Sequence, residues 1–304
     1  MTAHAAGDPA WRSHRLPAQE PFPWIPLVRS LAAHAVPGLE SVQFQDGAAV
    51  LRRLLPAPGG PVLAEVGFGA PESVTVRLAG GNPADDGALL ARLRRWLDLD
   101  APAAAVDGFL SGFPVLAPLV QARPGLRIPG TVDPWETAVL TVLGQQVSLA
   151  AARTFGSRLV GEFGTPGSEG FHLFPPAGRL AEAGAEKLQA AVRITGARAR
   201  TLQALAAAVT GGLDLAGTGN PGGAGLTADT RAGLLAVPGI GPWTVDYLAV
   251  RAAGDRDAFV PGDLVLRRTL GVKTALEASA LAQPWRPWRA YALFHLWTAA
   301  AYDR

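Results

Sequence analysis

The first hundred residues carry short apolar runs that glycine and proline interrupt every few positions. β-prone runs bounded in this way are typical of strands joined by tight turns. The runs lie at residues 42–44, 48–54, 62–68 and 73–78. Because short turns join consecutive runs, the pattern predicts an antiparallel meander.

Two segments around these strands show helical spacing instead. The first spans residues 25–35 and the second spans residues 88–98, where apolar residues recur on one stripe, namely Leu89, Leu90, Leu93 and Leu97. Such a stripe predicts a helix that packs its apolar face across the sheet. From residue 106 onward the strand pattern vanishes and helical spacing takes over.

The pattern therefore predicts an α+β protein with two parts. We expect an N-terminal antiparallel-sheet α/β domain at residues 21–105, followed by an all-α region at residues 106–304. The proline- and alanine-rich residues 1–20 are expected to form a disordered leader. A glycine-dense stretch at residues 211–225 is expected to be a flexible connection.

One helix of the second part has a clear start signal. In Asp133-Pro134-Trp135-Glu136, Asp133 suits the cap, Pro134 suits the first helical position, and Glu136 stands where a capping box needs it. The segment from Gly144 to Ser148 then breaks the helical pattern. Ser148 is expected to cap the following helix.

Another pair of helices is expected on either side of Gly239-Ile240-Gly241. Helical spacing precedes this turn, and Pro242 suits the first position of the next helix because its missing N–H has no partner there. A Gly-x-Gly turn can approach another molecule closely, and the N–H groups at a helix start attract an anion such as phosphate. Taken alone, the hairpin is either such a phosphate-binding element or an ordinary corner between two core helices.

Composition limits the class of protein. Of the 304 residues 49% are hydrophobic and 17% are charged, which is ample for packed cores. No apolar run reaches the roughly 18 residues of a membrane span, and no secretory signal is evident, so we expect a soluble intracellular protein. The lack of cysteine excludes disulfides, thiolate zinc sites and iron–sulfur clusters, and we expect no metal and no cofactor. A formal charge of +2 permits nucleic-acid binding without arguing for it.

The residues that follow the hairpin change its interpretation. Val-Pro-Gly-Ile-Gly-Pro-Trp-Thr-Val-Asp-Tyr at 237–247 and Val-Pro-Gly-Asp at 260–263 together resemble the hairpin, Gly/Pro loop and aspartate of the HhH-GPD superfamily of DNA glycosylases. Within that superfamily the chain is similar to the AlkA-type 3-methyladenine DNA glycosylases. The N-terminal part shares their Phe-x-Trp start at 22–24 and their Trp-Leu-Asp-Leu helix end at 96–99. The resemblance covers nearly everything after residue 20.

The resemblance implies a bacterial, monofunctional enzyme of base excision repair. Such an enzyme flips alkylated bases, including 3-methyladenine and 7-methylguanine, out of double-stranded DNA and hydrolyses their N-glycosidic bonds. We expect it to be a monomer in the cytoplasm, associated with the nucleoid and not with a membrane. Two alternatives stay open. One is a glycosylase of the same superfamily for another lesion, and the other is a non-catalytic helix-hairpin-helix DNA-binding protein.

Asp263 matches the catalytic aspartate of the family. A carboxylate beside the sugar carbon either stabilises an oxocarbenium-like transition state or orients a water molecule for attack. Asp263 also suits the cap of a helix at residues 264–270, and the two roles are compatible. No second acid is evident to protonate the leaving base, and a cationic alkylated purine needs little or no protonation.

Three aromatic residues are expected to form the base pocket. Trp243 and Tyr247 are four residues apart, which places both on one helix face beside the loop of Asp263. The resemblance adds Trp297. Their π faces attract a cationic base by about 0.5–2 kcal/mol per contact. Trp243 also stands where relatives that cleave the DNA backbone carry a lysine for a Schiff base, so we expect an intact abasic strand as the product.

DNA contacts are expected at two neighbouring loops. One is the hairpin, with Gly239, Ile240, Gly241 and Thr244. The other is the break after the helix that starts at Asp133, with Gln145 and Gln146. Gln146 resembles the family's wedge, the side chain that fills the gap left by a rotated nucleotide, and its alternative is a polar turn residue. Arginines that either bind phosphate or only solvate a helix face are Arg193, Arg198, Arg200, Arg251, Arg267 and Arg268.

One part of the pocket departs from the family pattern. AlkA-type enzymes carry an aromatic residue and an arginine on the helix after Phe-x-Trp, whereas alignment from Phe22 places Ser30 and His34 there. A lone histidine on a mostly apolar helix is more often structural. We therefore assign neither Ser30 nor His34 to the catalytic set.

Overall fold

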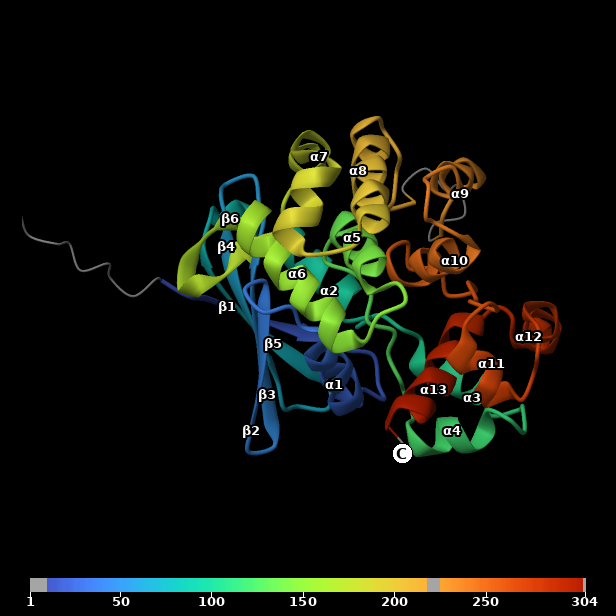
Figure 1. Cartoon of the computed structure of the whole chain (residues 1–304). Coiled ribbons are helices and arrows are strands. Elements are labelled where there is room, and N and C mark those ends of the chain that lie inside the picture. The colour runs from blue at the N-terminus through green and yellow to red at the C-terminus, as the bar shows by residue number, and fades with distance from the viewer. Residues whose placement is uncertain (1–9, 218–224, 303–304) are drawn as a thin grey trace, which may run out of the picture.

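Figure 1 shows the computed structural model of the chain, which describes residues 10–217 and 225–302. A sheet lies at one side of the molecule and helices fill the other. Residues 1–9 of the expected leader and residues 218–224 of the expected connection lie outside the described residues. Within the described part, no helix has the length and apolar character needed to cross a membrane.

The N-terminal domain is built on one antiparallel sheet with the strand order β1-β5-β4-β3-β2. The strands are β1 (Arg12–Pro17), β2 (Glu40–Gln45), β3 (Ala48–Leu55), β4 (Val62–Phe68) and β5 (Ser73–Gly80). Leu51 of β3 pairs with Val42 of β2 and with Val66 of β4, and Val66 also pairs with Val76 of β5. The predicted meander from β2 to β5 is confirmed.

Strand β1 corrects the expectation that residues 1–20 form a disordered leader. It pairs antiparallel with β5 along its whole length. Arg12 donates to Asp86 at 2.8 Å, His14 bonds to the same carboxylate at 3.1 Å, and Leu16 is buried. The segment is polar and lacks a strand pattern of its own. It becomes a strand because a partner distant in sequence satisfies its backbone groups.

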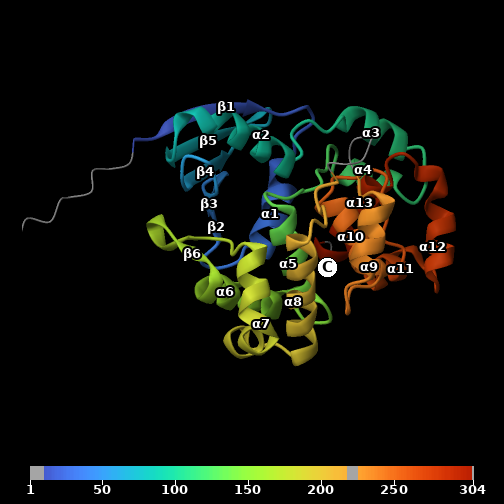
Figure 2. The ribbon, with the colours of Figure 1, turned by 90° about the horizontal axis from the view of Figure 1, so that it is seen from above.

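Two helices pack on this sheet, α1 (Trp24–His34) and α2 (Asp86–Trp96). They share one core with the strands. Figures 1 and 2 show both helices on the side of the sheet that faces the helical part. The buried helix residues in that core are Leu27, Val28, Leu31, Leu89, Leu93, Trp96 and, just after α2, Leu97. The apolar stripe predicted for the second helix therefore faces the sheet.

The rest of the described chain is mainly helical. The helices are α3 (Ala103–Leu110), α4 (Ala117–Ala122), α5 (Pro134–Gly144), α6 (Leu149–Phe163), α7 (Ala177–Val192), α8 (Gly196–Thr210), α9 (Ala228–Leu235), α10 (Pro242–Arg251), α11 (Leu264–Leu270), α12 (Ala275–Ala282) and α13 (Arg289–Tyr302). A short hairpin of β6 (Thr165–Pro166) and β7 (His172–Leu173) separates α6 from α7, and 3-10 turns lie at Pro83–Asp85, Ser168–Gly170 and Gln283–Trp285. The predicted α+β fold class is confirmed.

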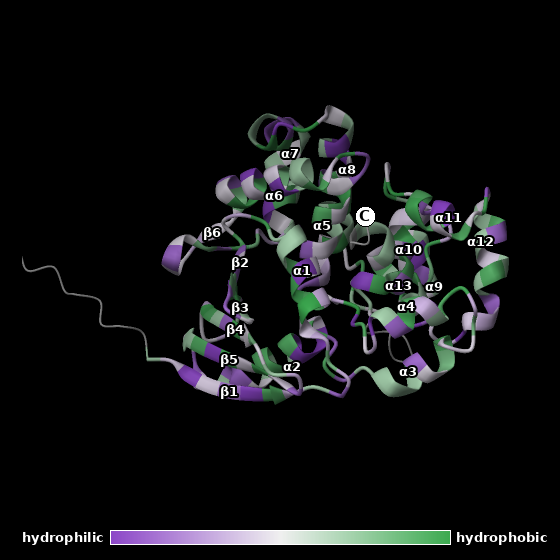
Figure 3. Ribbon diagram, turned by 90° about the horizontal axis from the view of Figure 1, so that it is seen from below, coloured by the Kyte–Doolittle hydropathy of each residue, from purple (hydrophilic) through white to green (hydrophobic). Residues whose placement is uncertain are grey.

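Helix α5 lies in the middle of the helical part and packs against α6, α8 and α10. One core runs through these helices, and it includes Val106 and Leu110 of α3 and Val120 of α4. Figure 3 shows hydrophobic segments in α5, α10 and α13, and these helices contribute buried residues to this core. The expected domain boundary between residues 105 and 106 stays a prediction.

Helix α5 begins as predicted but without the capping box. Asp133 accepts the N–H of Trp135 at 2.9 Å. Glu136 instead accepts two hydrogen bonds from Arg53 of β3, at 2.7 and 3.2 Å, and Arg53 also donates to Glu40 at 2.8 Å. Arg53 is only 3% exposed, and a buried guanidinium is costly unless it is paired. Glu136 is therefore drawn to the sheet, and the ion pair joins the two domains.

Candidate active site

The predicted helix-hairpin-helix is formed by α9, a turn and α10. In the turn Gly239 has a φ of +89°, and a Cβ there would lie 2.2 Å from the hydroxyl oxygen of Thr201. That hydroxyl donates to the carbonyl of Pro238 at 2.8 Å. Gly241 has open space where a Cβ would stand. The fold thus requires glycine at 239, whereas the open side of Gly241 leaves room for another molecule to approach.

Two of the expected DNA contacts lie inside the protein. Ile240 is 6% exposed and Thr244 is 3% exposed. Their N–H groups donate to the carbonyls of Val237 and Gly241, each at 3.0 Å. Ile240 and Thr244 therefore support the turn from within, while Gly239 is exposed on its outer side.

Gln145 also stabilises the hairpin by hydrogen bonds. Its side-chain amide donates to the carbonyl of Gly239 at 3.2 Å and to the hydroxyl of Thr244 at 3.0 Å. Arg198, a candidate for phosphate binding, donates to the carbonyl of Gln145 and lies over the ring of Phe155, 5.9 Å from its centroid. Gln145 and Arg198 hold the loop after α5 against the hairpin.

Gln146 differs from Gln145 in exposure, in side-chain hydrogen bonding and in backbone conformation. It is exposed, and its side chain makes no hydrogen bond to any residue that the structure describes. Its φ is +56°, a left-handed conformation that costs a side-chain-bearing residue about 1–3 kcal/mol. Ser148 caps α6 as predicted, through the N–H of Ala151 at 3.2 Å. The assignment of Gln146 as wedge stays a prediction.

Asp263 is held by three N–H donors. One carboxylate oxygen accepts the backbone N–H of Leu266 at 2.8 Å, which confirms that Asp263 caps α11. The same oxygen accepts the indole N–H of Trp297 at 3.0 Å, and the other accepts the indole N–H of Trp243 at 3.1 Å. Hydrogen bonds from these three donors fix the orientation of the carboxylate.

The three predicted aromatic residues meet at one cavity. The Trp243 and Tyr247 rings stack at 5.2 Å with an interplanar angle of 14°, and Trp297 lies 6.0 Å from Tyr247. The cavity has a volume of about 290 Å³. We call it the aromatic pocket, and its lining also includes Asp263, the only acid in it, and Phe294. The sequence prediction that these residues converge is therefore confirmed in geometry.

The aromatic pocket extends to the N-terminal domain, at the positions that the alignment from Phe22 indicated. Ser30 and His34 of α1 line it. The ring nitrogen Nδ1 of His34 bonds to the carbonyl of Ser30 at 2.8 Å. Enclosure by protein, and then the positive charges of Arg251 and Arg153, lower the pKa of His34. Their spacing of four residues was the available signal, since it puts both on one face of α1.

Arg251 lines the aromatic pocket, and its role as a phosphate ligand stays a prediction. Its guanidinium lies 5.7 Å from the ring centroid of Tyr247 and 5.8 Å from that of Phe294. It donates to the hydroxyl of Tyr247 at 3.1 Å, while its buried Nε has no hydrogen-bond partner. A positive charge thus stands at the wall of the aromatic pocket.

Four arginine candidates for phosphate binding remain. Arg267 donates to the carbonyl of Lys273 at 2.6 Å, at the end of its own helix. For the others, Arg193, Arg200 and Arg268, phosphate binding stays a prediction.

Two family models match the chain in succession. Residues 13–133 match the AlkA N-terminal domain, and residues 139–279 match the HhH-GPD superfamily base excision DNA repair protein. Among solved structures, the 3-methyladenine DNA glycosylase from Archaeoglobus fulgidus superposes with a TM-score of 0.78 at 19% identity. The match covers 95% of this chain and 99% of that one, and it shows a shared fold.

Two curated relatives align over most of this chain. The probable bifunctional transcriptional activator/DNA repair enzyme AlkA of Mycobacterium tuberculosis is 41% identical over 294 residues, which are 94% of this chain and 56% of the relative. The chain thus spans little more than half of that protein's length. DNA-3-methyladenine glycosylase 2 of Escherichia coli is 33% identical, with 92% of this chain and 94% of the relative covered. The chain therefore belongs to the AlkA family of the HhH-GPD superfamily of base excision DNA repair proteins.

Proposed function

We propose that this protein is a monofunctional DNA glycosylase that excises alkylated bases, such as 3-methyladenine and 7-methylguanine, from double-stranded DNA. The observation that carries the proposal is the position of Asp263. It is the single acid of an aromatic pocket, and two indole N–H groups of that pocket hold its carboxylate. The names of the curated relatives support the same substrate class.

In the proposed mechanism the target nucleotide leaves the duplex before chemistry begins. Gln146 occupies the vacated space, and the exposed side of the hairpin at Gly239 and Gly241 binds phosphate. The base enters the aromatic pocket, where the stacked rings of Trp243 and Tyr247 offer a π face.

Bond cleavage then depends on Asp263. As the bond between the sugar carbon and the base nitrogen lengthens, positive charge develops on the sugar. The ionised carboxylate stabilises this charge or orients the attacking water. A cationic base leaves without an acid catalyst, which suits a pocket that has one carboxylate.

The product is an intact abasic strand. Trp243 occupies the position at which lyase relatives carry a lysine, and its indole nitrogen donates to Asp263. An indole cannot form a Schiff base with the sugar. We further propose that the enzyme acts as a monomer on duplex DNA at the bacterial nucleoid.

A competing function is a DNA-binding module without catalysis. The cap that Asp263 provides to α11 favours it, because a cap needs no further role. The two functions differ in what a substitution of Asp263 does. If Asp263 is the catalytic carboxylate, Asp263→Asn loses excision. If the protein is only a binding module, its activity is DNA binding, and Asp263→Asn keeps it.

The test is single-turnover excision from a duplex with one 3-methyladenine. We expect Asp263→Asn to bind an abasic-site analogue but to excise several orders of magnitude more slowly. The matched control is Asp229→Asn, an exposed acid in the first turn of α9. A near-native rate in Asp263→Asn refutes the mechanism. Borohydride trapping of wild-type enzyme on DNA, at the level of a lysine-bearing relative, refutes the monofunctional assignment.

A further inference from the structure

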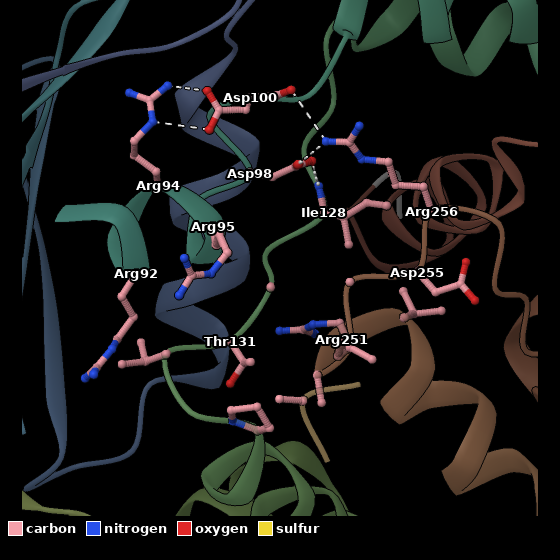
Figure 4. A pocket seen from close by; sticks show the side chains of 18 of the residues that line it. Arg92, Arg94, Arg95, Asp98, Asp100, Ile128, Thr131, Arg251, Asp255 and Arg256 are labelled. Carbon is pink, nitrogen blue, oxygen red and sulfur yellow. Dashed lines mark hydrogen bonds and ion pairs between the residues drawn. The ribbon is translucent and has the colours of Figure 1, made fainter. Parts of the chain in front are cut away.

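A second and larger cavity lies between the two domains. Its volume is about 650 Å³, compared with about 290 Å³ for the aromatic pocket. Helix α2, the segment 128–134 and the end of α10 surround it (Figure 4). It adjoins the last turn of α10, whereas the hairpin precedes the first turn. Ten helical residues separate these ends by about 15 Å.

The lining of this cavity carries an excess of positive charge, and we call it the arginine cavity. Its charged residues are Arg92, Arg94, Arg95, Arg251, Arg256, Asp98, Asp100 and Asp255. Five arginines against three aspartates leave two positive charges in excess. Lys and His are absent from the lining. A partly enclosed space with such an excess attracts anions.

The acids of the arginine cavity are occupied by other donors. Asp100 accepts two hydrogen bonds from Arg94. Asp98 accepts the hydroxyl of Tyr291 at 3.0 Å and the N–H of Ile128 at 3.2 Å. Asp255 accepts a backbone N–H, that of residue 257, at 2.9 Å. None of these acids bonds to Arg92, Arg95 or Arg251.

Two arginines therefore point into the cavity without a carboxylate partner. Figure 4 shows the guanidinium groups of Arg95 and Arg251 directed into the same space from α2 and α10. The side chain of Arg95 makes no hydrogen bond or ion pair within the described part of the chain. The Nε of Arg251 is buried and has no acceptor. Arg92 stands beside them, and half-burial together with the charges of Arg95 and Arg53 lowers its pKa.

We propose that the arginine cavity binds a small phosphate-type anion between Arg95 and Arg251. The planar fork of a guanidinium matches the geometry of phosphate oxygens, and neither arginine has a carboxylate partner in the described part of the chain. The volume is that of a small-molecule site. The ligand is a free phosphate or the phosphoryl group of a small phosphorylated molecule.

Calorimetric titration of the whole chain at constant ionic strength tests this proposal. Inorganic phosphate, pyrophosphate and glycerol 3-phosphate are the ligands, and sodium chloride is the blank. We expect saturable binding of one anion per chain. Arg95→Gln should weaken it at least about tenfold, the scale of one charge-assisted hydrogen bond. The exposed Arg95 has no partner to lose, so this variant should fold normally.

The matched control is Arg179→Gln on α7, an exposed arginine outside the lining of the arginine cavity. It removes the same net charge and should bind like the wild type. The ligand should also raise the melting temperature of the wild type more than that of Arg95→Gln. Tighter binding of the ester assigns the site to phosphorylated molecules, and tighter binding of inorganic phosphate assigns it to the free anion. Absence of saturable binding, equal weakening in both variants, or displacement of the anion by undamaged duplex DNA overturns the proposal.

Discussion

Two cavities lie on either side of Arg251, and their charges are arranged in opposite ways. In the aromatic pocket a single carboxylate accepts hydrogen bonds from N–H donors, and the walls include the rings of Trp243, Tyr247, Phe294 and Trp297. In the arginine cavity the acids are bonded to other donors, and Arg95 and Arg251 have no carboxylate partner within the described part of the chain. In the aromatic pocket the negative charge of Asp263 is positioned to stabilise a transition state. In the arginine cavity the positive charges are positioned to bind an anionic ligand.

The difference originates on one face of α10. Trp243, Tyr247 and Arg251 follow one another at four-residue intervals, so each lies one turn beyond the last. The two rings stack at 5.2 Å, and the guanidinium lies 5.7 Å from the second ring. A single helix face thus runs from the aspartate to the boundary between the cavities. Substitutions along this face separate the roles of the two cavities.

After loss of the carboxylate itself, the largest effect should follow from removing the indole donors of Asp263. In the double variant Trp243→Phe and Trp297→Phe, aromatic rings remain but both side-chain N–H groups are lost. A charge-assisted hydrogen bond contributes about 1.5–3 kcal/mol, so single-turnover excision should slow by about 10²–10⁴-fold. Trp135→Phe is the control, because it also loses an indole hydrogen bond, the one that Trp135 donates to the carbonyl of Pro175 at 2.9 Å. A wild-type excision rate in the double variant would show that these donors do not contribute to catalysis by Asp263.

Gln146→Ala tests a residue that acts before a base enters the aromatic pocket. Loss of a side chain from the vacated stack should weaken binding to an abasic-site duplex by about 1–3 kcal/mol. Gln45→Ala, an exposed glutamine on β2, is the control for truncation alone. Equilibrium binding by fluorescence anisotropy provides the measurement. If affinity and excision both stay at the wild-type level, Gln146 is only a turn residue.

Arg251→Met should alter which bases the aromatic pocket favours. The wild type should excise cationic bases faster than neutral hypoxanthine, because π faces favour cations. Arg251 opposes this preference with a like charge, which contributes about 1 kcal/mol at 4 Å in a water-like dielectric. Its removal should therefore increase the rate ratio of 3-methyladenine to hypoxanthine by about fivefold. Single-turnover rates on defined duplexes measure the ratio, with Arg179→Met as control, and an unchanged or smaller ratio contradicts the prediction.

The smallest expected effect is a shift in the pKa of His34. The chain has five histidines, so NMR titration with His34→Asn as the assignment control resolves this residue. Arg251→Met should raise the pKa of His34 toward 6.5 without reaching it, because the enclosing protein still opposes charge. The folded pKa lies below the unfolded one, so the unfolded chain binds more protons below about pH 6.5. The free energy of unfolding should fall as pH drops there, and fall less in Arg251→Met. An unaltered pKa would mean that Arg251 does not act on His34.

Local features of the structure were predictable from the sequence. The meander, the hairpin and the caps at Asp133, Ser148 and Asp263 depend on residues within a few positions of one another. Glycine and proline select such turns by their own backbone preferences. The aromatic pocket was predictable in part, because Trp243 and Tyr247 share a helix face and the family motif supplied Trp297 and Asp263.

Features that depend on distant partners were decided only by the tertiary structure. Strand β1 is polar and forms because β5 pairs with it. Glu136 forms no capping box because its carboxylate pairs with Arg53, a buried arginine of the sheet. His34 enters the aromatic pocket, and Arg95 comes to face Arg251, because the sheet domain packs beside α10. Local spacing determines which side chains share a face. Packing between domains determines what that face meets, because burial and pairing act between residues far apart in the chain.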